Sequence, residues 1–160
     1  MAIEYHFDAS PVLDDRAALD YFAGALGFER RYTDHRAGSD ELQATVSMVP
    51  AEEDPEMAAM LGGVKAILSI TFRQAKNLGD VGDAHVVRDL LTAITRFLEE
   101  FPDANGVFAY NFETILVQKL GDGGIELDQR LREPGGDNRH GTLADLLAKY
   151  PVLEIDQVLL

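Results

Sequence analysis

The 160-residue sequence contains no cysteine, which excludes a disulfide framework and any metal site built on thiolates. It has no apolar stretch close to the ~20 residues that span a bilayer, so we expect no membrane contact. Residues 1–6 lack the basic region and long apolar run of a signal peptide. Together these absences predict a cytoplasmic protein.

Basic residues are also scarce. Fourteen Lys and Arg stand against 28 Asp and Glu, and the formal net charge is −14. Such a field repels phosphate backbones, so we expect no nucleic-acid partner. It attracts a basic protein partner and speeds the encounter with it, although solubility alone is an alternative explanation of the charge.

The apolar residues follow patterns of both strands and helices. Ile3, Tyr5 and Phe7 alternate with polar residues, as in a half-buried strand, and the run 64–72 is typical of a central strand. Further strands are predicted at 28–33, 42–49, 107–112, 115–120 and 125–128, and helices at 17–26, 57–61, 83–101 and after Thr142, while the tail 152–160 fits either state. We predict one α+β domain over residues 1–160, with one long and one or two shorter helices on one face of a mostly antiparallel sheet.

The strongest helix prediction covers residues 83–101. Its apolar side chains form one continuous stripe, which includes Leu90, Leu91 and Phe97. Asp83 is the predicted N-cap, and Pro102 ends the helix. In the first helix, Asp14 or Asp15 can serve as the N-cap and Gly27 as the C-terminal cap; Thr142 and Asp145 resemble a capping box for the last helix.

Residues 17–32, "AALDYFAGALGFERRY", resemble the first helix of glyoxalase-like metalloenzymes. In that superfamily a residue on the preceding strand and an acid on the last strand bind a divalent ion, and His6 and Glu126 stand at corresponding places. Imidazole and carboxylate suit Fe, Ni, Zn or Mn. However, the sequence offers no third ligand at a matching position, and its order of elements does not repeat the βαβββ unit of the superfamily. We therefore expect no metal site and no cofactor, and keep a glyoxalase-like enzyme or small-molecule-binding protein as the alternative.

No catalytic motif is present. The sequence contains no HExxH, GxSxG, P-loop or GxGxxG, and no Ser, Thr or Lys has a recognisable partner for nucleophilic catalysis. We accordingly predict no catalytic residues and no enzymatic activity.

Three segments resemble a family of bacterial immunity proteins. They are "MAIEYHFD", "ILSITFRQAKN" and "FPDANGVFAYNFETILVQKLGDGGIELDQ". Together they are similar to the Sit-type (swarming-inhibition) immunity proteins, which are encoded beside polymorphic toxins. The sequence departs from that pattern at Lys119, where an Arg is expected, and at Asp128, where an Asn is expected. The resemblance implies a non-enzymatic protein that binds one cognate toxin and occludes its active surface.

The segment "PAEEDPE" is the predicted recognition element. It carries Glu52, Glu53, Asp54 and Glu56 between two strand predictions. Four carboxylates at this position would speed association with a basic toxin, whereas the simpler interpretation is a solvated loop. A structural, oligomer-forming protein is a third possibility for the chain.

Overall fold

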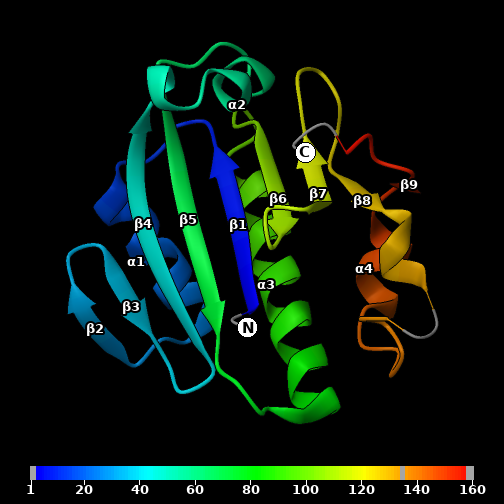
Figure 1. The fold of residues 1–160 in the computed structure, drawn as a ribbon. Helices are drawn as coiled ribbons and strands as arrows, with labels where there is room; N and C mark the ends of the chain where they lie inside the picture. Colours follow the sequence, from blue (N-terminus) through cyan, green and yellow to red (C-terminus); the bar gives the residue numbers. More distant parts are fainter. Residues whose placement is uncertain (1–2, 134–135, 158–160) are drawn as a thin grey trace.

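The computed structural model describes residues 3–133 and 136–157. Its nine strands form one sheet in the order β2-β3-β4-β5-β1-β6-β7-β8-β9 (Figure 1). All neighbours are antiparallel except β8 and β9, which are parallel. The strands are β1 Ile3–Ala9, β2 Arg30–Thr33, β3 Arg36–Gly38, β4 Leu42–Pro50, β5 Ala66–Gln74, β6 Gly106–Tyr110, β7 Thr114–Lys119, β8 Glu126–Asp128 and β9 Val152–Leu153; the α-helices are α1 Asp15–Leu26, α2 Pro55–Met60, α3 Gly79–Glu100 and α4 Ala144–Lys149, and short 3-10 turns span Ala51–Glu53 and Gln129–Arg132.

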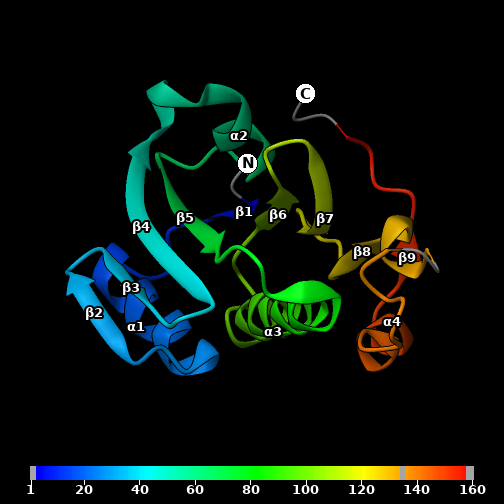
Figure 2. The ribbon, with the colours of Figure 1, turned by 60° about the horizontal axis from the view of Figure 1, so that its bottom comes forward.

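The main core lies between the sheet and the helices α1 and α3, which cover the same face (Figure 2). Odd-numbered residues of β1 point into this core, as their alternation predicts. Its centre is a cluster of aromatic side chains, each 0 % exposed: Phe7, Phe22, Phe72, Phe97 and Phe108. The rings of Phe7 and Phe97 meet edge to face with centroids 5.5 Å apart, a favourable arrangement that adds to the burial of their surface.

A second, smaller apolar cluster lies on the opposite face of the sheet. Met57, Ala58 and Leu61 from α2 and its C-terminal end pack there with buried residues of the sheet and the tail: Ile67, Val107, Ile115 and Ile155. The predicted α+β class, with a mostly antiparallel sheet and one long helix, is confirmed. The short helix α2, however, packs on the face that α1 and α3 leave free.

The long helix begins earlier than the sequence predicts. α3 starts at Gly79, with Leu78 as an N-cap that makes no side-chain hydrogen bond, so the prediction of Asp83 as N-cap is wrong. The first turn, "GDVG", carries two glycines, and its Val81 is 58 % exposed, so the apolar stripe does not extend into it. Asp83 lies in the second turn instead, where its carboxylate accepts a hydrogen bond from Gln74.

The predicted caps of α1 are confirmed, whereas the predicted capping box of α4 is wrong. Asp14 caps α1 through its Oδ1, which lies 2.7 Å from the Ala17 backbone nitrogen, and Gly27 ends the helix at φ 67°. Residues 34–40, which we expect to be a polar loop between the strands predicted at 28–33 and 42–49, contain the strand β3. Its two buried residues, Ala37 and Gly38, are too short a pattern to predict a strand. The capping box at Thr142 is wrong: Leu143 is the N-cap of α4, and the backbone nitrogen of Leu143 donates to Asn138 Oδ1 at 2.8 Å.

The tail after α4 joins the edge of the sheet as a strand. β9 pairs with β8, and the Gln157 side chain accepts from the Ile115 nitrogen at 2.6 Å and donates to the Ile115 oxygen at 3.3 Å. Residues 158–160 of the tail predicted as strand or helix lie outside the described residues. Within the described ranges, none of the helices combines the length and the apolar character that crossing a membrane requires.

Candidate partner-binding face

The central strands of the sheet are polar on the face opposite α1 and α3. This face is turned toward the viewer in Figure 1. Directly paired residues of neighbouring strands point to the same face. His6 is paired with Thr71 of β5 and Ala109 of β6, and Asp8 with Ser69 and Val107. We call this surface the polar face; its polar residues on β4, β5 and β1 are Gln43, Thr45, Ser47, Ser69, Thr71, Arg73, Glu4, His6 and Asp8.

The predicted recognition segment stands at one end of this face. Glu52, Glu53, Asp54 and Glu56 are all exposed. They occupy a 3-10 turn and the start of α2, and the Ala51 nitrogen donates to the Lys65 oxygen at 3.0 Å. Because α2 packs in the smaller apolar cluster, the helical turns that carry the four carboxylates are anchored to the sheet. Asp54 also has a structural part, because its Oδ1 accepts from the Met57 nitrogen at 3.2 Å and caps α2.

Asp8 connects the acidic segment to the polar face. Burial raises the pKa of the Asp8 carboxyl above its ordinary value, while a hydrogen bond with the Ser69 side chain opposes this rise and the charge of Asp54 adds to it. The charge of Asp54 therefore acts on Asp8, the last residue but one of β1. In the sequence Asp8 is only the polar partner in a strand alternation, so the pattern gave no signal of this role.

A second feature of the face is the stack of Phe112 on His6. The two ring centroids lie 3.2 Å apart, and Phe112 remains 64 % exposed while His6 is 3 % exposed. Asn111 and Phe112, the central residues of the β6–β7 turn, have φ angles of 48° and 59°, a conformation that is uncommon for a residue as large as Phe. Asn111 is fixed to β1 through two hydrogen bonds with the Glu4 backbone, of 3.0 and 2.8 Å. An exposed aromatic ring on a fixed turn is typical of an anchor residue in a protein interface.

His6 makes the stability of the fold sensitive to acid. Burial lowers the pKa of His6 to about 4, and the Glu4 charge opposes this only in part. Its Nδ1 lies 3.3 Å from Thr71 Oγ1, and its Nε2 has no hydrogen-bond partner among the described residues. The folded state therefore holds the ring neutral, whereas the unfolded chain takes up a proton near pH ~6.5.

We expect the free energy of unfolding to lose about 3 kcal/mol through His6 as the pH falls from ~6.5 to ~4, and to change little through this residue above that range. Chemical denaturation at a series of pH values would measure the loss. His6→Gln should flatten this part of the curve, and His140→Gln, at an exposed histidine, should not. Parallel curves for wild type and His6→Gln would contradict the assignment.

The two residues of the glyoxalase-like hypothesis are not brought together. His6 on β1 and Glu126 on β8 share a face, but β6 and β7 lie between their strands, which corresponds to roughly 14 Å. Glu126 Oε1 instead accepts from Gln118 Nε2 at 3.1 Å. In the ranges 3–133 and 136–157 no group of three or more His, Asp and Glu side chains is arranged to hold a metal ion.

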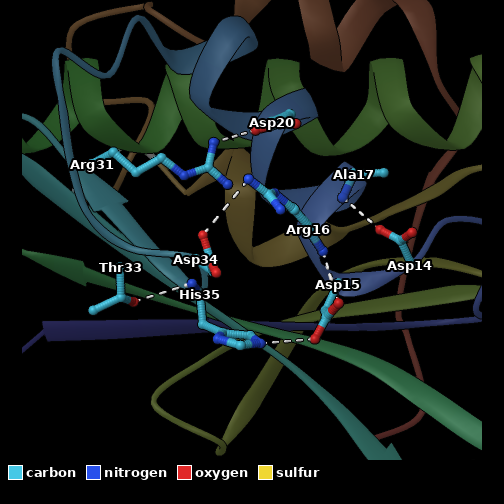
Figure 3. Close-up of polar contacts among 9 residues, drawn as sticks. All are labelled: Asp14, Asp15, Arg16, Ala17, Asp20, Arg31, Thr33, Asp34 and His35. Carbon is cyan, nitrogen blue, oxygen red and sulfur yellow. Dashed lines mark hydrogen bonds and ion pairs between the residues drawn. The ribbon is translucent and has the colours of Figure 1, made fainter.

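A separate cluster of charged side chains ties the β2–β3 hairpin to α1 (Figure 3). His35 Nε2 lies 3.0 Å from Asp15 Oδ2, Arg16 lies 3.8 Å from Asp34, and Arg31 pairs with Asp20. These contacts join an exposed hairpin to the first helix, so we assign the cluster a structural role.

Comparison of the chain with family models, with characterised proteins and with solved structures found no match.

Proposed function

We propose that this protein is a non-enzymatic immunity protein that binds and neutralises a cognate, basic bacterial toxin. The observation that carries the proposal is the anchored acidic segment: Glu52, Glu53, Asp54 and Glu56 stand exposed on helical turns at the end of a polar sheet face. The resemblance of three sequence segments to Sit-type immunity proteins supports the same function.

The anchoring of the segment favours binding over simple solvation. Carboxylates on a fixed backbone lose less conformational entropy when a partner orders them than carboxylates on a free loop. Carboxylates on a fixed backbone also concentrate the negative potential at one site on the surface, and this speeds the encounter with a basic protein. Phe112 on the same side of the sheet offers apolar contact area of the kind that holds a complex once it has formed.

The test is the association rate with a basic toxin domain, measured at several salt concentrations. In a variant with Glu52→Gln, Glu53→Gln, Asp54→Asn and Glu56→Gln, we expect the rate to fall by roughly tens-fold at low salt, and the difference from wild type to shrink as salt screens the charges. Asn at position 54 keeps the side-chain oxygen that caps α2, so the fold is retained.

A matched control removes four exposed carboxylates elsewhere: Glu29→Gln, Asp89→Asn, Asp103→Asn and Asp122→Asn. This control has the same net charge as the test variant, so only a local effect of the acidic segment separates the two. Equal rates for the two variants, or a rate and salt dependence unchanged from wild type in the test variant, would exclude the segment from the interface.

A further inference from the structure

A cleft lies on the helix-covered side of the sheet, away from the polar face and Phe112. It has a volume of about 370 Å³, within the ~300–1,000 Å³ typical of ligand pockets. α3 forms one wall, and residues after β8 form the other; Figure 2 shows α3 and this part of the chain on the same side of the sheet. No motif in the sequence indicates this cleft, because it is lined by five separate segments of the chain.

The floor of the cleft is aromatic and apolar. Tyr5 and Tyr110 line it with ring centroids 5.4 Å apart and planes tilted by 58°, and Tyr5 is further held by stacking on Phe108. Val87 and Leu116 complete an apolar surface around them. Tyrosine faces attract flat cations through the quadrupole of the ring.

Gln74 contributes a buried acceptor without a partner. It is 4 % exposed, and its Nε2 donates to Asp83 Oδ1 at 2.5 Å, both residues being part of the cleft wall. Because an ionised carboxylate only accepts, this contact fixes the amide with its nitrogen toward Asp83. Gln74 Oε1 is then left with no hydrogen-bond partner in the described part of the chain, a costly state that a ligand N–H group would relieve.

Carboxylates outnumber basic side chains in the lining of the cleft: Asp83, Glu133 and Asp137 stand against Arg130 and Arg139. Burial raises the pKa of the Asp137 carboxyl; the Arg139 charge opposes the rise, and the Asp83 charge adds to it. Burial also raises the pKa of Tyr5, with further contributions from Asp137, Tyr110 and Asp83. The contributions of Asp83 and Asp137 to these shifts are those of nearby negative charges, which favour a cation over an anion in the cleft.

The two arginines in the lining, Arg130 and Arg139, offset only part of this negative charge. Arg130 pairs with Asp128 at 3.2 Å, and Arg139 pairs with Asp80 at 3.3 Å; neither carboxylate is part of the lining. Each arginine is therefore shared with a carboxylate outside the cleft.

We propose that this cleft binds a guanidinium group, with Asp83, Asp137 and Gln74 Oε1 accepting its N–H groups and Tyr5 and Tyr110 contacting its flat face. A guanidinium is planar and carries five N–H donors, which matches several acceptors beside aromatic rings. The group can belong to a free small molecule or to an arginine side chain of another protein. This inference is independent of the proposed immunity function, since it uses none of the residues of the acidic segment.

The experiment titrates the full chain with agmatine, a small molecule that carries a guanidinium and an ammonium, and with a capped Gly-Arg-Gly peptide, using calorimetry and NMR of the Gln74 side-chain amide. We expect saturable binding with a shift of the Gln74 amide signal, and no binding of 1,4-diaminobutane, which has an ammonium in place of the guanidinium, or of N-butylurea, a neutral analogue. Tighter binding of agmatine would identify a small-molecule site, and equal or tighter binding of the peptide a site for an arginine side chain; either result supports the proposal.

The variants Asp137→Asn and Asp83→Asn should each weaken agmatine binding about tenfold or more, because each loses a charge-assisted hydrogen bond. Asp122→Asn removes an exposed carboxylate on the β7–β8 hairpin and should leave the affinity unchanged. Thermal unfolding would establish that the variants are folded. Absence of saturable agmatine binding to wild type, or the same affinity in Asp137→Asn and Asp122→Asn, would overturn the proposal.

Discussion

Replacing Leu91 by aspartate is expected to unfold the protein. Leu91 is 1 % exposed on α3 and packs in the main core between that helix and the sheet. An aspartate there would be a buried charge without a partner, and removal of the leucine would also leave a cavity. The combined cost, about 5 kcal/mol or more, is comparable with the whole ~5–15 kcal/mol of net stability of a typical domain.

Thermal unfolding followed by circular dichroism measures the effect. Thr92→Asp is the matched control, since it places the same charge on the next residue of α3, where the side chain is exposed. We expect the control to melt cooperatively, with a midpoint near that of wild type, and Leu91→Asp to show no cooperative transition. A Leu91→Asp protein that melted within a degree of wild type would show that the buried face of α3 is wrongly assigned.

Asp128→Ala is expected to release the C-terminal tail. Asp128 is 0 % exposed, and its carboxylate accepts from the Ile155 nitrogen at 3.0 Å, the Arg130 nitrogen at 3.0 Å and Arg130 Nη1 at 3.2 Å. It is therefore the junction between β8, the following 3-10 turn and the tail. Each buried donor left without an acceptor costs about 1–3 kcal/mol, and we expect a total loss of about 2–4 kcal/mol.

Hydrogen exchange separates this local effect from general destabilisation. Protection of the Ile155 amide should fall much further in Asp128→Ala than protection of amides in α3. Asp128→Asn is the informative companion, because it keeps one acceptor oxygen and is also the residue that the resemblance to Sit-type proteins leads one to expect. The Asp128→Asn protein should lose about half as much stability as Asp128→Ala. An Asp128→Ala protein as stable as wild type would exclude the carboxylate as the anchor of the tail.

The sequence predicted the parts of the fold that repeat a pattern over many residues. The alternation in β1 and the stripe along α3 are long enough to identify both elements and their buried sides. Short elements lack that signal. β3 has three residues with one buried alanine, and a six-residue helix such as α2 does not indicate which face of a sheet it covers. The first turn of α3, with two glycines and an exposed Val81, carries no stripe at all.

The candidate site was predictable only where its residues are consecutive. The acidic segment is one run of sequence, and Glu52, Glu53, Asp54 and Glu56 could be selected from it. Asp8 and Phe112 join the same side of the molecule through strand pairing between distant segments. Phe112 in addition depends on a turn with positive φ at Asn111, for which the sequence Asn-Phe is a weak signal, since Gly is the usual second residue.

The most direct test of the proposed immunity function is survival of bacteria that produce the proposed cognate toxin domain. We predict that co-expression of the wild-type chain restores growth, that a pull-down recovers the two proteins together, and that the variant lacking the four carboxylates of the acidic segment protects less well than the control of equal net charge. Failure of the folded wild-type protein to restore growth would contradict the proposal that it is an immunity protein.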